Sequence, residues 1–130
     1  MEVGKYMSRV RLLLLDSDCG LSTVHCEELD DYYKYIKCDT IDIVQRKIGN
    51  KVFDIICDDE GRFKNNPRLS MISIYDDYMA SLVGNLIFAN HDAEGNTTSL
   101  SSEDIAMIKS EAVRILDVDN GRMNWAVLCS

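Results

Sequence analysis

The sequence predicts an α+β domain: a mostly antiparallel sheet with a short N-terminal helix and a C-terminal helix packed on it. Residues 40–63 (TIDIVQRKIGNKVFDIICDDEGRF) place strand-forming residues on both sides of Gly49-Asn50, which is typical of a hairpin. Other apolar runs are also of strand length, and only two segments repeat apolar residues at helical steps. The chain of 130 residues has one proline and no internal repeat, so we expect a single domain over residues 1–130.

The first elements are two strands and a helix. Residues 9–15 (RVRLLLL) are predicted to form a central strand, residues 16–20 a turn, and residues 21–27 a second strand. The apolar run is far too short to cross a bilayer and no signal-peptide cleavage pattern follows it, so we expect a cytosolic protein without membrane contact. Residues 28–35 (ELDDYYKY) are predicted to form the short helix, because apolar side chains recur at three- and four-residue steps in Leu29, Tyr32, Tyr33 and Ile36.

The hairpin comes next. Gly49 and Asn50 both tolerate positive φ, which a tight two-residue connection requires. Lys47 and Lys51 flank the turn and discourage edge-to-edge association between copies of the chain. The polar connection that follows leads into a predicted strand at residues 70–75 (SMISIY), where apolar and polar residues alternate.

The last third contains a strand, a turn, a helix and a final strand. Residues 79–89 (MASLVGNLIFA) are predicted to be a second central strand, with a bulge or a close backbone approach at Gly84-Asn85, and residues 90–97 a turn. Ser101 or Ser102 caps the C-terminal helix, which packs on the sheet through one apolar face: Ile105, Ile108, Ala112 and Ile115. Residues 124–128 (NWAVL) are predicted to add the last strand.

The charge of the chain limits its partners. With 22 acidic and 14 basic residues the net charge is −8, which opposes direct, non-specific binding of nucleic acid through its phosphates. An acidic chain is still compatible with a small anion where a few arginines converge. It is also compatible with imitation of nucleic acid in the basic groove of a partner protein.

Reactive side chains show no pattern of a known catalytic or metal site. The five cysteines form no CxxC pair, which excludes zinc-ribbon and thioredoxin-like motifs and predicts reduced thiols. His25 and Cys26 are neighbours on a strand and therefore point to opposite faces. His91-Asp92 with Glu94 is compatible with a metal site or an acid–base pair, but turn chemistry explains these residues as well. We expect no metal, no cofactor and no catalysis.

A nucleotide site is the binding hypothesis that the residues allow, although phosphate-loop and dinucleotide glycine motifs are absent. Arginines would neutralise phosphates, an aromatic ring would stack on a base, and asparagines would bind its polar edge. Each residue has an ordinary alternative, a solvated surface charge or a place in the core. The candidate ligand-binding residues are Arg62, Arg68, Phe88, Asn90, Asn96 and Arg114, with Tyr75 as a second stacking candidate.

Three blocks of the chain carry a family resemblance: TIDIVQRKIGNKVFDIICDDEG, NPRLS and LVGNLIFANHDAEGNTTSLSSEDI. In order and spacing, over roughly residues 38–108, they resemble an uncharacterised small-protein family of gut Firmicutes, their phages and mobile elements. The chain is also similar to phage Thoeris anti-defence proteins, small α+β oligomers that sequester cyclic ADP-ribose-like signals. These resemblances imply a mobile-element origin and action in the host bacterial cytosol.

Two functional hypotheses from different classes follow. The first is a phage-type anti-defence protein, a homo-oligomer that sequesters a nucleotide immune signal, either cyclic ADP-ribose-like or a cyclic oligonucleotide. The alternative is an acidic anti-CRISPR-like inhibitor that blocks a bacterial defence protein by protein–protein contact. An enzyme acting on small metabolites is the third, and the sparse histidines argue against it.

Overall fold

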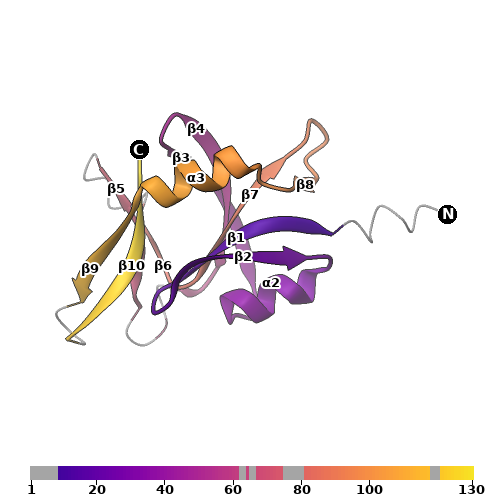
Figure 1. Cartoon of the computed structure of the whole chain (residues 1–130). Coiled ribbons are helices and arrows are strands. Elements are labelled where there is room, and N and C mark those ends of the chain that lie inside the picture. Colours follow the sequence, from indigo (N-terminus) through magenta and orange to yellow (C-terminus); the bar gives the residue numbers. More distant parts are fainter. Residues whose placement is uncertain (1–8, 62–63, 65–66, 75–80, 118–120) are drawn as a thin grey trace.

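The fold is described from a computed structural model, which places residues 9–61, 64, 67–74, 81–117 and 121–130. Within these described residues strands dominate, and two helices, α2 and α3, accompany them (Figure 1). The predicted α+β class with mostly antiparallel strands is therefore confirmed. In chain order the elements are β1 (Val10–Asp16), β2 (Gly20–Cys26), α2 (Leu29–Ile36), β3 (Ile41–Ile48), β4 (Lys51–Asp58), β5 (Leu69–Ser73), β6 (Leu82–Val83), β7 (Leu86–His91), β8 (Thr97–Thr98), α3 (Ser102–Ser110), β9 (Ala112–Asp117) and β10 (Arg122–Cys129).

The strands form two sheets rather than the single sheet expected. The larger sheet has the order β2-β1-β7-β4-β3, with β8 paired to β7, and the smaller has the order β6-β5-β10-β9. All pairings are antiparallel except the one between β5 and β10. The first apolar run is indeed a central strand, because β1 lies between β2 and β7.

Two apolar clusters hold these layers together. One lies between the sheets, where Leu15 and Phe53 of the larger sheet meet Met71 and Val127 of the smaller, with Ile108 of α3 beside them. The other lies on the opposite face of the larger sheet, which α2 covers through Ile36 and its tyrosines. Figure 1 shows α2 next to β1 and β2, and the β5-β6-β9-β10 sheet on the far side. The alternating strands of the larger sheet thus supply both clusters.

The predicted hairpin is confirmed in detail. β3 and β4 pair over their whole length, from Ile41 opposite Asp58 to Ile48 opposite Lys51. Gly49 has a φ of 64°, the left-handed conformation that a two-residue hairpin turn needs. The N-terminal caps of both helices are also formed by residues close together in the sequence. Glu28 with Asp31 forms a capping box at α2, and Ser101 with Asp104 forms one at α3.

The predicted strand at residues 79–89 is wrong. Its described part is two strands in different sheets, β6 and β7, and Gly84-Asn85 is the crossing between them rather than a bulge. Gly84 has a φ of 80°, which lets the chain change direction there. This crossing brings the ends of both sheets together on one side of the molecule.

The placement of the helices also differs from the prediction. The helix at Leu29–Ile36 follows two strands and is therefore not N-terminal, and α3 is followed by β9 and β10. α3 ends at Ser110, so Ala112 and Ile115 lie on β9, where they pair with Val127 and Asn124 of β10. Strand pairing with β10 outweighs the helical spacing of the apolar residues in this segment.

Candidate ligand-binding site

A polar cavity of about 220 Å³ lies where the chain passes between the sheets. It is lined by the turn after β1, the C-terminal end of α2, the end of β4, the segment leading into β5, and the Gly84-Asn85 crossing. We call it the Arg68 cavity, after one of the cations that line it. Its polar and charged lining residues are Asp16, Ser17, Asp18, Lys37, Asp58, Lys64, Arg68 and Asn85.

Arg68 forms an ion pair with an exposed partner. Its Nη1 donates to Asp18 Oδ1, and its Nη2 donates to the carbonyl of Met123 at 3.4 Å. The Arg68 side chain is 13% exposed, whereas that of Asp18 is 59% exposed. The hydrogen bond from Arg68 holds the pKa of Asp18 below its usual value. The carboxylate is therefore charged at neutral pH and neutralises a cation that is largely withdrawn from solvent.

Two polar atoms in this lining have no hydrogen-bond partner. Among the side chains that the structure describes, the buried atoms without one are Ser17 Oγ and Arg68 Nε. An unsatisfied buried donor costs roughly 1–3 kcal/mol, so native proteins leave few of them. Both residues line the same cavity, and Ser17 as a whole is 5% exposed. The cavity therefore offers a guanidinium N–H and a hydroxyl that are not used within the chain.

Further cations stand around the same cavity. Lys64 Nζ pairs with Asp58 Oδ2 and donates to the carbonyl of Lys37 at 3.3 Å. The hydrogen bond to Asp58 raises the pKa of Lys64, so this lysine stays protonated. Lys37, at the end of α2, lies near enough to lower the pKa of Asp18. The lining thus balances three cations with three carboxylates. Asp18 is the most exposed of these carboxylates.

The turn that carries Ser17 and Asp18 is fixed by its neighbours. Asp16 Oδ1 accepts from the backbone N–H groups of Asp18 at 2.8 Å and Cys19 at 3.2 Å. Asn85 accepts from Ser17 N at 3.4 Å and donates to the carbonyl of Tyr35 at 3.1 Å. The turn between β1 and β2, the crossing and α2 are therefore joined, which positions the cavity before any ligand arrives.

Comparison with known proteins places this fold in a family. The profile of DUF3846, a domain of unknown function, matches residues 10–112. The chain belongs to this family. No curated protein and no solved structure matches the chain. The DUF3846 match includes every residue of the Arg68 cavity and ends at the first residue of β9.

The residues proposed from sequence do not form one site. In this DUF3846 domain Phe88 is 0% exposed, inside the cluster between the sheets, so its ring has no free face on which a base could stack. Its role as a stacking residue is corrected: LIFA is a buried run of a central strand. Asn90 donates to Asp104 Oδ2 at 2.8 Å and belongs to the α3 cap. Asn96 donates to Asp92 Oδ2 at 3.3 Å within its own turn.

The cationic candidates are also dispersed. Arg114 is on β9, with its guanidinium 5.2 Å from the centre of the Trp125 ring, and it is not among the described residues that line the cavity. Arg62 and Tyr75 lie outside the described residues. Arg68 is the sequence candidate that lines the cavity. The sequence predicts Ser17 only as part of a turn. No neighbouring residue indicates that its hydroxyl is buried and without a hydrogen-bond partner.

A histidine–aspartate pair is a second feature that the sequence analysis did not predict. His91 Nδ1 lies 2.7 Å from Asp54 Oδ2, and Gln45 donates to Asp54 Oδ1 at 3.2 Å. Asp92 instead accepts from the backbone N–H groups of Glu94 and Asn96, which confirms the turn interpretation. Asp54 is a buried carboxylate inside the apolar run VFDIIC, and that misplaced polarity is the signal that could have found it. Among the described side chains His91 contacts no hydroxyl or thiol nucleophile, so the pair shows no catalytic couple.

Metal and membrane sites were also sought. Within the described part of the chain, no three histidine, cysteine, aspartate or glutamate side chains gather closely enough to hold a metal ion. No helix placed by the structure has the length and apolarity needed to span a bilayer.

Proposed function

We propose that this protein binds a small phosphate-bearing ligand in the Arg68 cavity without transforming it. The observation that carries this proposal is the pair of unpartnered buried atoms, Arg68 Nε and Ser17 Oγ, in one cavity. A phosphate oxygen would accept from both, and the guanidinium is suited to bidentate binding of phosphate. The described part of the lining holds neither histidine nor cysteine, which favours holding a ligand over converting it.

Asp18 would act as an internal substitute for the ligand anion. It satisfies Arg68 when the cavity is empty of ligand, and its 59% exposed side chain returns to water at little cost. Arg68 stays in place and exchanges one anion for another, so the ligand need not desolvate the cation again. Lys37 and Lys64 add positive charge at the entrance.

The size of the cavity favours a phosphate end rather than a whole large signal. Pockets for complete small ligands usually measure about 300–1,000 Å³, and the Arg68 cavity measures about 220 Å³. We propose a nucleotide as the ligand, with its phosphate in this cavity. Sequestration of a cyclic ADP-ribose-like or cyclic oligonucleotide immune signal by a phage-type homo-oligomer in the bacterial cytosol is the biological role that we propose for such binding.

The proposal is tested by two substitutions with opposite expected effects. Native mass spectrometry and calorimetry with mononucleotides, cyclic dinucleotides and cyclic ADP-ribose would first identify a bound ligand and the oligomeric state. Arg68→Gln should then weaken binding by roughly tenfold or more, since it removes a charged hydrogen-bond donor. Asp18→Asn should strengthen binding, because it removes the competing anion.

Arg114→Gln is the matched control, since that arginine lies on β9 and does not line the cavity. The Arg114→Gln variant should bind the ligand with the same affinity as the wild type. Equal loss of binding in Asp18→Asn and Arg68→Gln would show that the ion pair is structural and would remove the basis of the proposal. Thermal unfolding of each variant separates lost binding from lost folding.

One observation favours the alternative, an acidic inhibitor of a bacterial defence protein. A groove of about 1040 Å³ between the start of α2 and the turn after β7 is lined by Glu27, Glu28, Asp92 and Glu94, with no lysine or arginine among its described lining residues. Such a surface suits a basic partner. Inhibition of a purified CRISPR nuclease should then weaken steeply as salt rises, and Glu27→Gln with Glu94→Gln should reduce it while Glu103→Gln on α3 does not. Inhibition that is insensitive to salt would exclude this role.

A further inference from the structure

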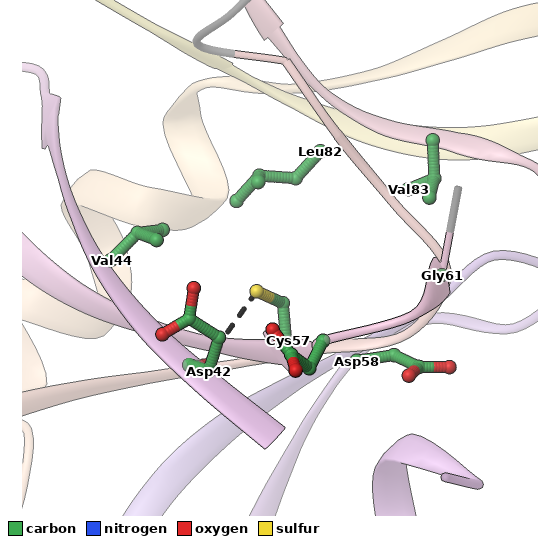
Figure 2. Close-up of a pocket in the computed structure, with 8 residues that line it drawn as sticks. Asp42, Val44, Cys57, Asp58, Gly61, Leu82 and Val83 are labelled. Carbon is green, nitrogen blue, oxygen red and sulfur yellow. Dashed lines mark hydrogen bonds between the residues drawn. The ribbon is translucent and has the colours of Figure 1, made fainter. Parts of the chain in front are cut away.

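We infer that a second cavity, adjoining the Arg68 cavity, binds the base of the ligand and selects bases that carry an amino group. This inference rests on the proposed function, because it assigns the organic part of a ligand whose phosphate lies at Arg68. The second cavity measures about 170 Å³ and lies between β3, β4 and β6 (Figure 2). It shares Asp58 and Gly61 with the Arg68 cavity, so one ligand can occupy both.

The walls of this second cavity are apolar. Val44 of β3 and Leu82 and Val83 of β6 line it, and Figure 2 shows the two β6 side chains across the space from Asp42 and Cys57. Cys57 is buried and directs its thiol to the carbonyl of Asp42, with Sγ and oxygen 3.6 Å apart. Burial raises the pKa of this thiol to about 11, so it stays neutral. A flat ring would therefore lie between aliphatic side chains and a neutral sulfur.

The polar groups of the second cavity are acceptors. Among the residues that the structure describes, its charged lining residues are Asp42, Asp58 and Asp59, and none of them is a cation. Ionised carboxylates accept hydrogen bonds and do not donate them, so they favour N–H groups and repel a phosphate. Asp58 is already used by Lys64 and by the backbone N–H of Glu60, and Asp42 Oδ1 accepts from Ile43 N at 2.9 Å. This leaves Asp42 Oδ2 and the exposed Asp59 for a ligand. The two cavities thus differ in charge: three cations balanced by three carboxylates, with unused donors, in one, and carboxylates with apolar walls in the other.

Gly61 is the residue at which the cavities meet. A Cβ added there would lie 3.1 Å from Val83 Cγ2 and 3.6 Å from the Cβ of Asp58, both of which line the second cavity. A methyl group would therefore narrow the boundary between the cavities and press on Val83. A nucleotide joins a phosphate to an apolar ring with N–H donors through a sugar, and this matches the order of the two cavities. Guanine, adenine and cytosine carry an exocyclic amino group, and Asp42 or Asp59 would accept a hydrogen bond from it.

The experiment compares mononucleotides with their counterparts that lack the amino group. Calorimetry would measure AMP against IMP, CMP against UMP, and ribose 5-phosphate as the phosphate alone. At least one amino-bearing nucleotide should bind roughly tenfold more tightly than its counterpart and than ribose 5-phosphate. The double variant Asp42→Asn/Asp59→Asn should lose that preference while binding ribose 5-phosphate like the wild type, because neither residue lines the Arg68 cavity. Gly61→Ala, at the boundary of the two cavities, should also lose the preference. Asp39→Asn, an exposed carboxylate that lines neither cavity, is the control.

The outcomes separate this inference from the proposed function. Equal affinity for ribose 5-phosphate and every nucleotide, or a preference that survives the double variant, would overturn the role of the second cavity and leave the Arg68 cavity intact. Failure of ribose 5-phosphate and of all nucleotides to bind would overturn both.

Discussion

The pH dependence of stability should report on Asp104, the carboxylate that joins α3 to the larger sheet. Asp104 is 5% exposed, and its Oδ1 lies 2.9 Å from Lys51 Nζ. Its Oδ2 accepts from Asn90 at 2.8 Å and from the backbone N–H of Ser101 at 3.1 Å. Burial alone would raise the pKa of Asp104, but these hydrogen bonds outweigh it and lower the pKa to about 2.

The magnitude follows from linkage between protonation and folding. The pKa falls from 3.8 to about 2 on folding, which corresponds to about 2 kcal/mol of stability at neutral pH. Because the folded-state pKa is the lower one, this stability is complete above the unfolded value and is lost as the pH falls through the folded value. Roughly 1 kcal/mol should remain near pH 2.5.

The measurement is urea unfolding of the wild type and of Asp104→Asn, followed by the fluorescence of Trp125, the single tryptophan. The difference in the free energy of unfolding between the two proteins should shrink by roughly 1–2 kcal/mol between pH 6 and pH 2.5. Glu103→Gln, an exposed carboxylate in the same first turn of α3, is the control for the helix dipole. A difference that is the same at both pH values would refute the reasoning.

Three further outcomes test the described packing. Gly20→Ala should destabilise the protein more than Gly95→Ala: both positions have positive φ, but the added Cβ at Gly20 lies 3.2 Å from the Trp125 indole nitrogen, whereas Gly95 has open space. Thermal unfolding measures the difference, and equal losses would contradict it. Phe88→Ala should cost roughly 3–5 kcal/mol in urea unfolding, as for a core aromatic, and a cost below about 1 kcal/mol would contradict its burial. With a thiol reagent at neutral pH, Cys19, the exposed cysteine, should react fast and the four buried ones slowly, and fast labelling that survives Cys19→Ser would contradict this.

Much of the fold is determined by residues that are close together in the sequence. Gly49-Asn50 specifies its turn through backbone conformation, and the residues around it alternate at the period of a strand, so the hairpin follows from neighbours alone. Ser101 with Asp104 likewise marks the start of α3 through its own hydrogen bonds. Residues 86–91 are different, because β7 pairs with β1 and β4, which are distant in the sequence. Residues 112–117 pair with the next strand, β10, and the helical spacing of their apolar residues hides this pairing. Despite that spacing, these residues form β9 because they pair with β10.

The site was less predictable than the fold for a related reason. A residue type shows which chemistry is available, whereas exposure and partners are set by tertiary structure. Phe88 and Asn90 have suitable chemistry for binding a base, but the first is buried and the second caps α3. Arg68 keeps its predicted place as a ligand-binding candidate because its guanidinium has an atom that no partner uses. Ser17 was overlooked, since burial of a serine in a turn leaves no trace in the local sequence.

The position of the Arg68 cavity follows from the way the chain connects the two sheets. Gly84 N donates to the carbonyl of Arg68 at 2.8 Å, so the crossing out of β6 is fixed to the backbone that carries the guanidinium. Trp125 N donates to the carbonyl of Ser17 at 2.9 Å, which ties the β1–β2 turn to the smaller sheet. These bonds use backbone atoms and leave Arg68 Nε and Ser17 Oγ without a partner among the described residues. Buried polar atoms are usually hydrogen-bonded, and the phosphate-bearing ligand that we propose would supply a partner for both.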